Sequence, residues 1–339
     1  MNSFWKNKRV LVTGHTGFKG SWLSLWLQKL GAELTGYSKS IPTDPSMFEL
    51  CNVKEGMISI EGDIRNLDKL KNTIDQFNPE IVIHMAAQSL VHESYEYPLE
   101  TLSTNIIGTA NVLQSVRDTK VKVLINVTSD KCYENNNLER GYNENDPMGG
   151  FDPYSCSKGC AELVTSSFRR SFFEKGTAVA TVRAGNVIGG GDWGKNRIVP
   201  DIMEAIINHT PIHIRNPNAV RPWQFVLEPL RGYMLLAEKM WHDKGFSEGW
   251  NFGPDYSDIR PVSYLLGKLA GTSIDIKYDK GDFKHEANIL KLDCTKARQR
   301  LDWHPKTNLD FALANIMEWY KSKDMREITE TQIERFEKL

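Results

Sequence analysis

Apolar residues follow two alternating patterns along the first half of the chain. Short runs that are apolar at nearly every position are typical of parallel strands that helices cover on both faces. Stretches with apolar residues at helical spacing separate these runs. The predicted strands cover residues 9–12, 33–37, 57–61, 81–85, 121–127 and 178–183, and the predicted helices cover residues 21–27, 67–77, 104–116 and 155–175. This alternation predicts an α/β fold with a doubly wound parallel Rossmann sheet, whose ligand lies at the carboxyl ends of the strands.

The pattern changes beyond about residue 185. A glycine-rich, aromatic-tipped loop at residues 189–193 is predicted to be flexible, and proline and charge are frequent from residue 200 to residue 222. We expect a smaller, mixed and irregular substrate domain here, interleaved with strands that return to the first domain. The predicted division assigns residues 1–184 and about 223–254 to the dinucleotide-binding Rossmann domain, and residues 185–222 and 255–339 to the substrate domain.

Composition excludes several classes of protein. The 339 residues carry a formal net charge of −1, which disfavours a general nucleic-acid-binding protein. Five cysteines are an odd number, which argues against a closed disulfide framework. Cys156 and Cys160 would share a helix face, but no further His or Cys completes a metal site. We therefore predict that both are small buried packing residues and that no metal is bound.

The chain also lacks the signals of a membrane or exported protein. No stretch approaches the roughly 18 consecutive apolar residues of a membrane helix. The N-terminal residues contain no apolar segment of signal-peptide length. We expect a cytoplasmic protein with no membrane partner.

Glycines at positions 14, 17 and 20 lie between a predicted strand and a predicted helix. In this context Gly14 permits a tight turn, and Gly17 lets backbone amides approach a pyrophosphate at the helix N-terminus. Gly20 allows the helix to pack closely on the strand. The predicted dinucleotide site also includes Thr16, Phe18 and Lys19.

The second predicted strand does not end in the acidic residue that often binds the adenosine ribose. Tyr37 and Ser38 are predicted to contact the cofactor there. Ser38, Lys39 or Ser40 could bind ribose hydroxyls or a 2′-phosphate, so we expect NAD without excluding NADP. Asp63 and Ile64 follow the third strand. Asp63 could bind the adenine amino group, or it could cap the next helix.

Tyr154 and Lys158 are four residues apart and share one face of a predicted helix. A free tyrosine has a pKa near ~10, too high for a base at neutral pH. A neighbouring ammonium and a positive nicotinamide ring would both lower that pKa. The pair could then remove a hydroxyl proton while hydride leaves the same carbon. Ser129, at the carboxyl end of a predicted strand, could hydrogen-bond the same substrate oxygen.

These motifs occur in the order seen in extended short-chain dehydrogenases/reductases, and the chain resembles that family over nearly its whole length. Besides the glycine turn and the Tyr–Lys pair, the resemblance rests on residues 84–88, 105–109, 126–133 and 301–305. It implies a cofactor site that also contains Ala86, Ala87, Gln88, Thr104 and Val127, together with Tyr154 and Lys158. His84 is predicted to be a core histidine, and Cys132 and Tyr133 to pack the wall of the site.

The residues after Ser129 narrow the resemblance. Sugar-nucleotide 4,6-dehydratases typically have an acid and then a Glu at this point, whereas this chain has Asp130 and then Lys131. In having Lys131 after Asp130, and in residues 183–193, the chain is similar to CDP-glucose 4,6-dehydratases. Enzymes of that kind act in the synthesis of deoxysugars such as those of lipopolysaccharide O-antigen. The residues themselves leave a simpler alternative open, in which Asp130 caps its loop and Lys131 is solvated.

The resemblance implies a mechanism without net redox. Tyr154, helped by Lys158 and Ser129, removes the C4 hydroxyl proton as hydride leaves C4. Asp130 protonates the C6 hydroxyl so that water departs. Lys131 is either a neutral C5 base or a cation that stabilises the enolate while another group is the base. Because hydride returns to the sugar, the cofactor would be retained between turnovers.

A nucleotide-sugar diphosphate requires cations near it, and an arginine fork suits phosphate geometry. The substrate-binding residues implied by the resemblance are Ser89, Asn186, Arg197, Val199, Arg215 and Arg221, with His285 and Glu286 as further candidates.

Two rival functions remain. One is another nucleotide-sugar enzyme on the same scaffold, such as a 4-epimerase, although an epimerase needs no acid such as Asp130. The other is a non-catalytic dinucleotide sensor or scaffold, although such proteins tend to lose the pair that Tyr154 and Lys158 form. We expect a homodimer or homotetramer, with contacts through the predicted helices at residues 104–116 and 155–175.

Overall fold

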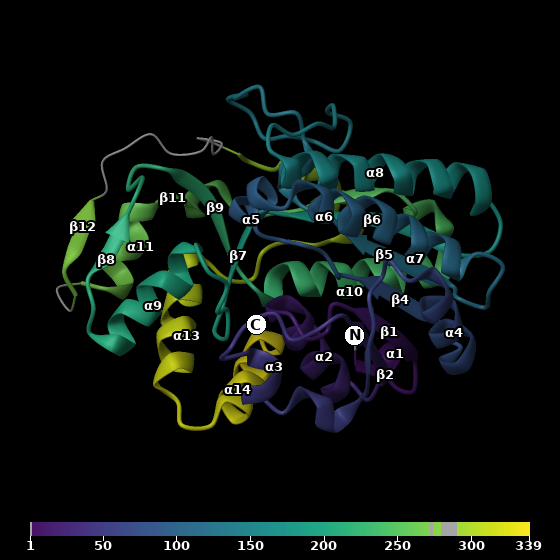
Figure 1. The fold of residues 1–339 in the computed structure, drawn as a ribbon, viewed down its shortest axis with the longest axis horizontal. Helices are drawn as coiled ribbons and strands as arrows, with labels where there is room; N and C mark the ends of the chain where they lie inside the picture. The colour runs from purple at the N-terminus through teal and green to yellow at the C-terminus, as the bar shows by residue number, and fades with distance from the viewer. Residues whose placement is uncertain (1, 272–273, 279–289) are drawn as a thin grey trace.

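Seven parallel strands form one large sheet at the centre of the protein (Figure 1). The structure is a computed structural model that describes residues 2–271, 274–278 and 290–339. The strands of this sheet are β1 (Arg9–Thr13), β2 (Glu33–Ser38), β3 (Ile58–Glu61), β4 (Ile81–His84), β5 (Val123–Val127), β6 (Ala178–Ala184) and β10 (Gly249–Phe252). The predicted doubly wound α/β sheet is confirmed.

The central strands are apolar on both sides because each side faces a separate hydrophobic core. Val10 and Val12 of β1 belong to the larger core, and Leu11 between them belongs to the smaller one. Two long helices pack against the face of the larger core: α2 (Phe18–Lys29) and α10 (Leu227–His242). Three helices cover the other face: α4 (Leu67–Phe77), α7 (Gly108–Val116) and α8 (Pro153–Phe172), as Figure 1 shows.

The strand order is β10-β6-β5-β4-β1-β2-β3, so the winding direction reverses between β1 and β4. In open α/β sheets, the crevice at such a reversal is where ligands bind, beyond the carboxyl ends of the strands. The segments that follow Thr13 and His84, at the ends of β1 and β4, therefore border the expected site.

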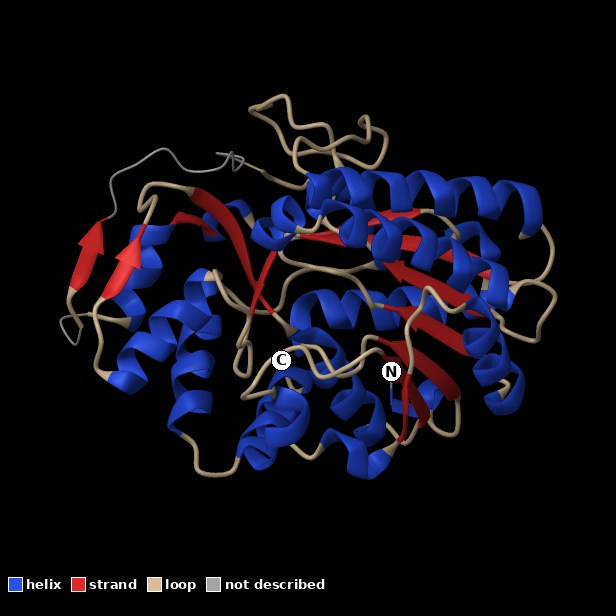
Figure 2. Ribbon diagram, in the orientation of Figure 1, coloured by secondary structure: helices blue, strands red, loops and turns tan. Residues whose placement is uncertain are grey.

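A smaller mixed region lies beside the large sheet (Figure 2). Its strands are β7 (Asn186–Ile188), β9 (Val220–Phe225) and β11 (Ile259–Pro261) in one sheet, and β8 (Ile212–Ile214) and β12 (Ile276–Tyr278) in another. Its helices are α9 (Ile198–Asn208), α11 (Val262–Leu269) and α13 (Leu309–Lys321). Of the two other late helices, α12 (Thr295–Leu301) packs against β10 and α10, and α14 (Met325–Glu337) packs against α13 and α2. Strand β10 returns from this part of the chain to the large sheet, whereas the division into two domains stays a prediction.

Three elements differ from their predicted form. The predicted helix at residues 104–116 begins as a π-helical turn, η2 (Ser103–Ile107), before α7. Helix α8 starts earlier than predicted because Asp152 accepts a hydrogen bond from the Ser155 amide at 2.9 Å and Pro153 is its first residue. The loop at residues 189–193 is largely buried, not exposed and flexible, because Gly190 packs against the Trp319 ring and accepts a hydrogen bond from Trp22 Nε1.

Short elements connect the layers. The helices are α1 (Asn2–Trp5), α3 (Met47–Leu50), α5 (Val91–Glu96) and α6 (Pro98–Leu102), and the 3₁₀ turns are η1 (Val53–Gly56), η3 (Asp130–Cys132), η4 (Lys244–Phe246) and η5 (Tyr256–Asp258). Across the described ranges, no helix is long and apolar enough to cross a membrane.

Candidate active site

The glycine turn between β1 and α2 has the close contacts that its spacing predicts. Gly14 has a φ of +77°, and a Cβ there would lie 2.7 Å from the Ala86 amide nitrogen. A Cβ on Gly20 would lie 2.1 Å from the Gly14 carbonyl oxygen, so only glycine lets α2 approach β1 this closely. A Cβ on Gly17 would meet nothing closer than 3.5 Å. Gly17 thus leaves open space at the N-terminus of α2, where no side chain caps the helix amides.

The end of β2 is bound to this turn by a buried histidine. His15 Nδ1 is 2.9 Å from Ser38 Oγ, and its Nε2 is 2.7 Å from Ser59 Oγ. Burial lowers the pKa of His15 to about 4, so the ring is neutral at pH 7. Thr16 Oγ1 donates to the Ser40 carbonyl at 2.7 Å. The predicted ribose-binding segment is therefore held against the glycine turn, and Lys39 pairs with Glu100 at 3.1 Å.

Asp63 does not cap a helix, because Asn66 is the N-cap of α4. Its carboxylate instead binds the Arg65 guanidinium, with Nη2 to Oδ2 at 2.6 Å. The hydrogen bond from Arg65 holds the pKa of Asp63 below its ordinary value. The Tyr37 hydroxyl donates to the Asp63 carbonyl at 3.1 Å, which joins the ends of β2 and β3. Ile64 is buried against Gly108.

The segment after β4 lies against the same turn. Thr13 Oγ1 accepts from the amides of Met85 and Ala86 at 3.1 and 3.2 Å. His84 is the predicted core histidine, between Thr13 Oγ1 at 2.7 Å and Thr109 Oγ1 at 3.2 Å, and burial lowers its pKa to about 3. Ala87 and Thr104 are half-buried.

The Gln88 side chain is engaged within the protein. It donates from Nε2 to Thr101 Oγ1 at 2.8 Å and to the Leu90 carbonyl at 3.0 Å. Asn105, in the π-helical turn, donates to the Gln88 carbonyl at 2.9 Å and to Ser157 Oγ at 2.8 Å. The turn η2 thereby connects the segment after β4 to α8.

Tyr154 and Lys158 share the buried face of α8, as their spacing predicts. Lys158 Nζ lies 6.0 Å from the centre of the Tyr154 ring and donates to the Val127 carbonyl at 3.4 Å. Burial and the nearby Lys19 ammonium lower the pKa of Lys158 to about 8. Ser129 lies close enough to the Tyr154 hydroxyl to lower its pKa. Ser129, Tyr154 and Lys158, the residues predicted to act in the oxidation at C4, therefore lie close to one another.

The predicted lowering of the Tyr154 pKa is wrong for these residues alone. Burial raises the pKa of Tyr154 to about 12, although hydrogen bonding with Ser129 acts in the opposite direction. Asp130 raises the pKa further through space, whereas Arg197 lowers it. The protein by itself therefore favours the neutral phenol.

Asp130 lies buried on the turn that follows β5. Ser129 Oγ donates to its Oδ1 at 3.0 Å, and a Cβ on Gly185 would lie 3.3 Å from its Oδ2. Burial raises the pKa of Asp130, although Lys131 and the buried Arg221 act against this rise. The loop cap here is Ser129, which accepts from the Lys131 amide at 3.2 Å. The Asp130 carboxyl also interacts with the Lys131 amide, so its role as a loop cap stays open beside its place close to Tyr154.

Cations gather on the other side of Asp130. Arg197 binds Asp192 at 3.1 Å and donates to Ser89 Oγ at 3.2 Å. Lys19 is half-buried, and burial together with Arg197 lowers its pKa to about 8, while Asp130 and Asp192 oppose the change. Lys19, predicted only as a cofactor residue, therefore also belongs to the charged set around Asp130.

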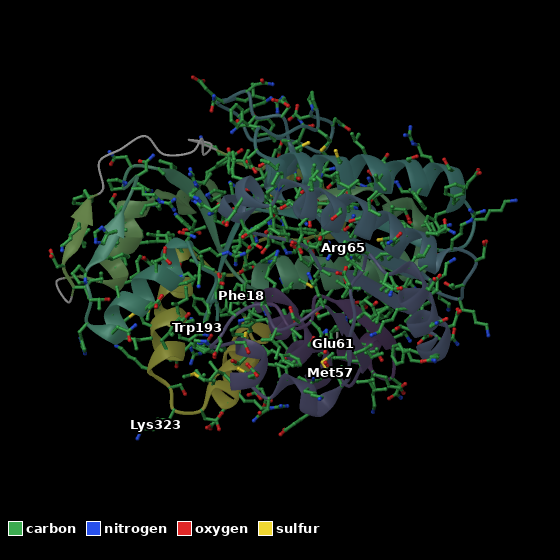
Figure 3. All side chains as sticks on the ribbon, in the orientation of Figure 1. Phe18, Met57, Glu61, Arg65, Trp193 and Lys323 are labelled. Atoms are coloured by element: carbon green, nitrogen blue, oxygen red, sulfur yellow. The ribbon has the colours of Figure 1, made fainter. Side chains whose placement is uncertain are left out.

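The remaining predicted site residues have fewer contacts with the groups described above. Asn186 is half-buried on β7, and Val199 is buried in α9. Arg215 Nη1 lies 2.5 Å from His92 Nε2. Phe18 lies near the middle of the molecule in Figure 3, and a Cβ on Gly189 would lie 3.1 Å from its Cζ. His285 and Glu286 lie outside the described residues.

The prediction that Cys156 and Cys160 are buried packing residues is wrong. Cys156 is exposed on α8 and Cys160 is partly buried, so these two are not buried packing residues. Cys132 and Tyr133 are fully buried behind the Asp130 turn, as predicted. Within the part of the chain that the structure describes, no group of His, Cys, Asp and Glu could hold a metal ion.

Two buried residues beside this site were not predicted. Glu162 follows Lys158 by four residues on the same helix face, and Arg183 ends the run of apolar residues in β6. They form a buried ion pair with two contacts of 2.8 Å. The spacing from Tyr154 through Lys158 to Glu162 was a signal for the first of them.

Comparison with known proteins agrees with this geometry. Residues 10–248 match the NAD dependent epimerase/dehydratase family. The chain is 51% identical over 331 residues to the CDP-glucose 4,6-dehydratase of Salmonella typhimurium, with 94% of this chain and 92% of that protein covered. The predicted resemblance is thereby confirmed at the level of sequence.

Solved structures show the same fold. The UDP-glucose 4-epimerase of Thermotoga maritima, solved with UDP-glucose, superimposes with a TM-score of 0.80 at 24% identity, covering 92% of this chain and 98% of that one. The dTDP-glucose 4,6-dehydratase of Bacillus anthracis, solved with NAD, has a TM-score of 0.78 at 20% identity, covering 95% and 99%. The glycine turn leaves room for a pyrophosphate, and the Tyr–Lys pair is buried. With these features and a match over most of its length, this chain belongs to the NAD dependent epimerase/dehydratase family.

Proposed function

We propose that this protein is a CDP-glucose 4,6-dehydratase, which converts CDP-glucose to CDP-4-keto-6-deoxyglucose with loss of water. The observation that carries the proposal is Asp130, a buried carboxyl with a raised pKa beside Ser129 and Tyr154. An epimerase needs no acid at C6, whereas a dehydratase must protonate a departing hydroxyl. The 51% identity to the Salmonella typhimurium dehydratase supports this choice and the cytidine base.

NAD fits the residues at the glycine turn. The space beside Gly17 and the uncapped amides of α2 suit a pyrophosphate, since a helix N-terminus favours an anion. We assign Gly14, Thr16, Gly17, Ser38 and Ala86 to its binding. The pairing of Lys39 with Glu100 supports NAD over a 2′-phosphorylated cofactor. When bound, NAD would supply reversible hydride transfer with C4 and C6 of the sugar. Because no net redox occurs, we propose that it stays bound between turnovers.

The remaining steps belong to side chains of this protein. Tyr154 takes the C4 hydroxyl proton, and Ser129 hydrogen-bonds the same oxygen. Lys158 adds positive charge that favours the phenolate form of Tyr154. Asp130 then gives its proton to the C6 hydroxyl, a role that its raised pKa favours. Lys131, on the same turn, acts at C5 either as the base or as the cation that stabilises the enolate.

The diphosphate of the substrate would lie against arginines. Arg197 and the buried Arg221 stand on the side of Asp130 that faces the smaller region, and Arg215 lies farther along it. We propose that these three, with Ser89 and Asn186, bind the nucleotide sugar. Residues 185–222 and 255–339 would then form the substrate domain, and residues 1–184 with about 223–254 the dinucleotide domain.

The wider setting follows the same proposal. Exposed Ile107 and Leu163 leave apolar surface on η2 and α8, which supports a homodimer or homotetramer through these helices. Five free thiols suit the reducing cytoplasm. The product would supply deoxysugar synthesis, such as that of lipopolysaccharide O-antigen.

The test is to incubate the purified protein separately with CDP-glucose and with dTDP-, GDP- and UDP-glucose, with and without added NAD. A 4-keto-6-deoxy product is detected by its absorbance in alkali and by loss of one water in mass spectrometry. We expect product from CDP-glucose, and none or far less from the others. Epimerised sugar without loss of water would establish a 4-epimerase instead. If no sugar changes even with NAD, a non-catalytic dinucleotide-binding protein becomes the better account.

A further inference from the structure

A single buried ion pair lies directly behind the turn that carries Asp130. Glu162 and Arg183 are both almost fully buried, with side-chain exposures of 5% and 4%. Arg183 Nε donates to Glu162 Oε1 and its Nη2 donates to Oε2, each at 2.8 Å. This two-point geometry fixes the relative orientation of the two side chains. Burial opposes ionisation of Glu162, but Arg183 and hydrogen bonds hold its pKa below the ordinary value.

Each half of the ion pair holds one end of the same segment. Thr128 Oγ1, immediately before Ser129, donates to Glu162 Oε1 at 2.5 Å. Arg183 Nη1 donates at 2.5 Å to the hydroxyl of Tyr133, immediately after Cys132. The Tyr133 hydroxyl in turn donates a hydrogen bond to Asn251 Oδ1 at 2.8 Å. Residues 129–132 are therefore tethered at both ends to one pair of charges.

The pair also joins this segment to the oxidation residues. Tyr154, Lys158 and Glu162 follow one another at intervals of four on α8, so they share a helix face. Oxidation acts at C4 and elimination at C5 and C6 of one sugar ring. Groups on α8 and on the Asp130 turn must therefore keep a fixed separation for both steps to occur.

We propose that Glu162 and Arg183 are positioning residues, which hold the segment with Asp130 and Lys131 at its working distance from Tyr154 and Lys158. This inference rests on the proposed dehydratase function. Loss of a tether should therefore slow elimination more than oxidation at C4, because Tyr154 and Lys158 stay on an intact α8. Of the oxidation residues, only Ser129 lies on the tethered segment.

The hydroxyl tethers test this role better than the charges do, because removing one partner of a buried ion pair is strongly destabilising. Thr128→Val and Tyr133→Phe each delete one tether with little change of shape. The matched control is Thr181→Val: Thr181 Oγ1 donates to Glu162 Oε2 at 2.6 Å but lies on β6, outside the tethered segment. All three variants remove one buried hydroxyl from the network that the ion pair organises.

The experiment combines single-turnover kinetics with amide hydrogen exchange on the holoenzyme. With CDP-glucose, we expect product formation about 10- to 100-fold slower in Thr128→Val and Tyr133→Phe, since small misplacement of reacting groups has effects of this size. The near-ultraviolet absorbance that reports C4 oxidation should slow by a clearly smaller factor, since Tyr154 and Lys158 lie outside the tethered segment, and KM should change little. Exchange of the amides at residues 129–132 should accelerate in both variants. Thr181→Val should resemble wild type in every readout.

Equal effects in Thr128→Val and Thr181→Val would overturn the proposal, because they would indicate a general packing role. Slowing of oxidation and elimination by the same factor would also overturn it. If wild-type protein releases no water from CDP-glucose, the dehydratase function fails. Amide exchange still tests the tether in that case. Faster exchange at residues 129–132 in Thr128→Val and Tyr133→Phe but not in Thr181→Val supports it, and the same exchange rate in all three variants refutes it.

Discussion

At the scale of single residues, burial sets the protonation state of several groups around the site. Asp130 has a raised pKa and Lys158 a lowered one, and desolvation is the leading cause of both shifts. A carboxyl with a raised pKa thereby lies close to the hydroxyl groups of Ser129 and Tyr154. Through space, Arg221 opposes the rise at Asp130, and Lys19 adds to the lowering at Lys158.

The role of Asp130 leads to the first prediction. Asp130→Asn keeps the shape of the side chain but removes the acid, so we expect dehydration of CDP-glucose to fall about 10²- to 10⁴-fold. Release of 4-keto-6-deoxy product measures the effect. Asp146→Asn is the matched control, since Asp146 pairs with the exposed Arg140 and lies outside the site. A variant at Asp130 that dehydrates at the wild-type rate would remove this residue from the mechanism.

His15 leads to a second prediction, which concerns stability. Its folded-state pKa of about 4 lies below the ordinary value of 6.5, so the unfolded chain binds more protons between these pH values. Stability is therefore lost as pH falls from about 6.5 toward 4. Between pH 7 and pH 5, wild type should lose about 2 kcal/mol more of its free energy of unfolding than His15→Gln does.

Denaturant unfolding at the two pH values checks this prediction. His213→Gln, at an exposed histidine on β8, is the control and should follow wild type. Identical pH dependence in wild type and His15→Gln would show that another group controls stability in acid.

At the scale of elements, two glycines of the turn, three residues apart, meet two different structural requirements. Gly20 serves the contact of α2 with β1, whereas Gly17 serves the open space at the helix N-terminus. The same change, glycine to alanine, should therefore have different effects at the two positions.

We expect Gly20→Ala to destabilise the protein by about 3 kcal/mol or more, because its Cβ would lie 2.1 Å from the Gly14 carbonyl oxygen. Gly17→Ala should change stability by less than about 1 kcal/mol, since its nearest contact is 3.5 Å. It should instead weaken NAD binding. Thermal unfolding and titration with NAD measure the two effects. Equal destabilisation by both changes would contradict this division.

At the scale of the whole molecule, the last helix of the chain packs against α2, which follows the glycine turn. Phe336 on α14 is fully buried and meets Trp26 of α2 edge to face, with ring centres 5.8 Å apart. Trp26 Nε1 also donates to Glu337 Oε1 at 2.9 Å. The helix that begins at the dinucleotide turn is thus packed from behind by residues more than 300 positions later.

Phe336→Ala should therefore lower the free energy of unfolding by about 3 to 5 kcal/mol, the usual range for a deleted core aromatic ring. Leu339→Ala is the control: Leu339 is 58% exposed, so its loss should have an effect below about 0.5 kcal/mol. Denaturant unfolding of both variants provides the measurement. A small effect of Phe336→Ala would show that α14 is not part of the cooperative core.

Much of the fold and part of the site could be predicted without the structure. Strands β2, β4 and β6 and helix α4 lie within one residue of their predicted bounds, because apolar periodicity is a local property of the chain. The positions of Gly14 and Gly20, and the shared face of Tyr154 and Lys158, also follow from local spacing. The buried loop at residues 189–193 was not predictable, since its burial depends on Trp319, more than 120 residues later.

The amino-acid sequence by itself thus determined the alternation of strands and helices, the dinucleotide turn and the order of the catalytic residues, because each depends on neighbours within a few positions. Only the tertiary structure decided which carboxyl is buried next to Tyr154, how far burial raises the pKa of that tyrosine, and that Glu162 pairs with Arg183 behind the Asp130 turn. The physical reason is that desolvation and ion pairing depend on distances between residues that are remote in the chain, and packing alone sets those distances.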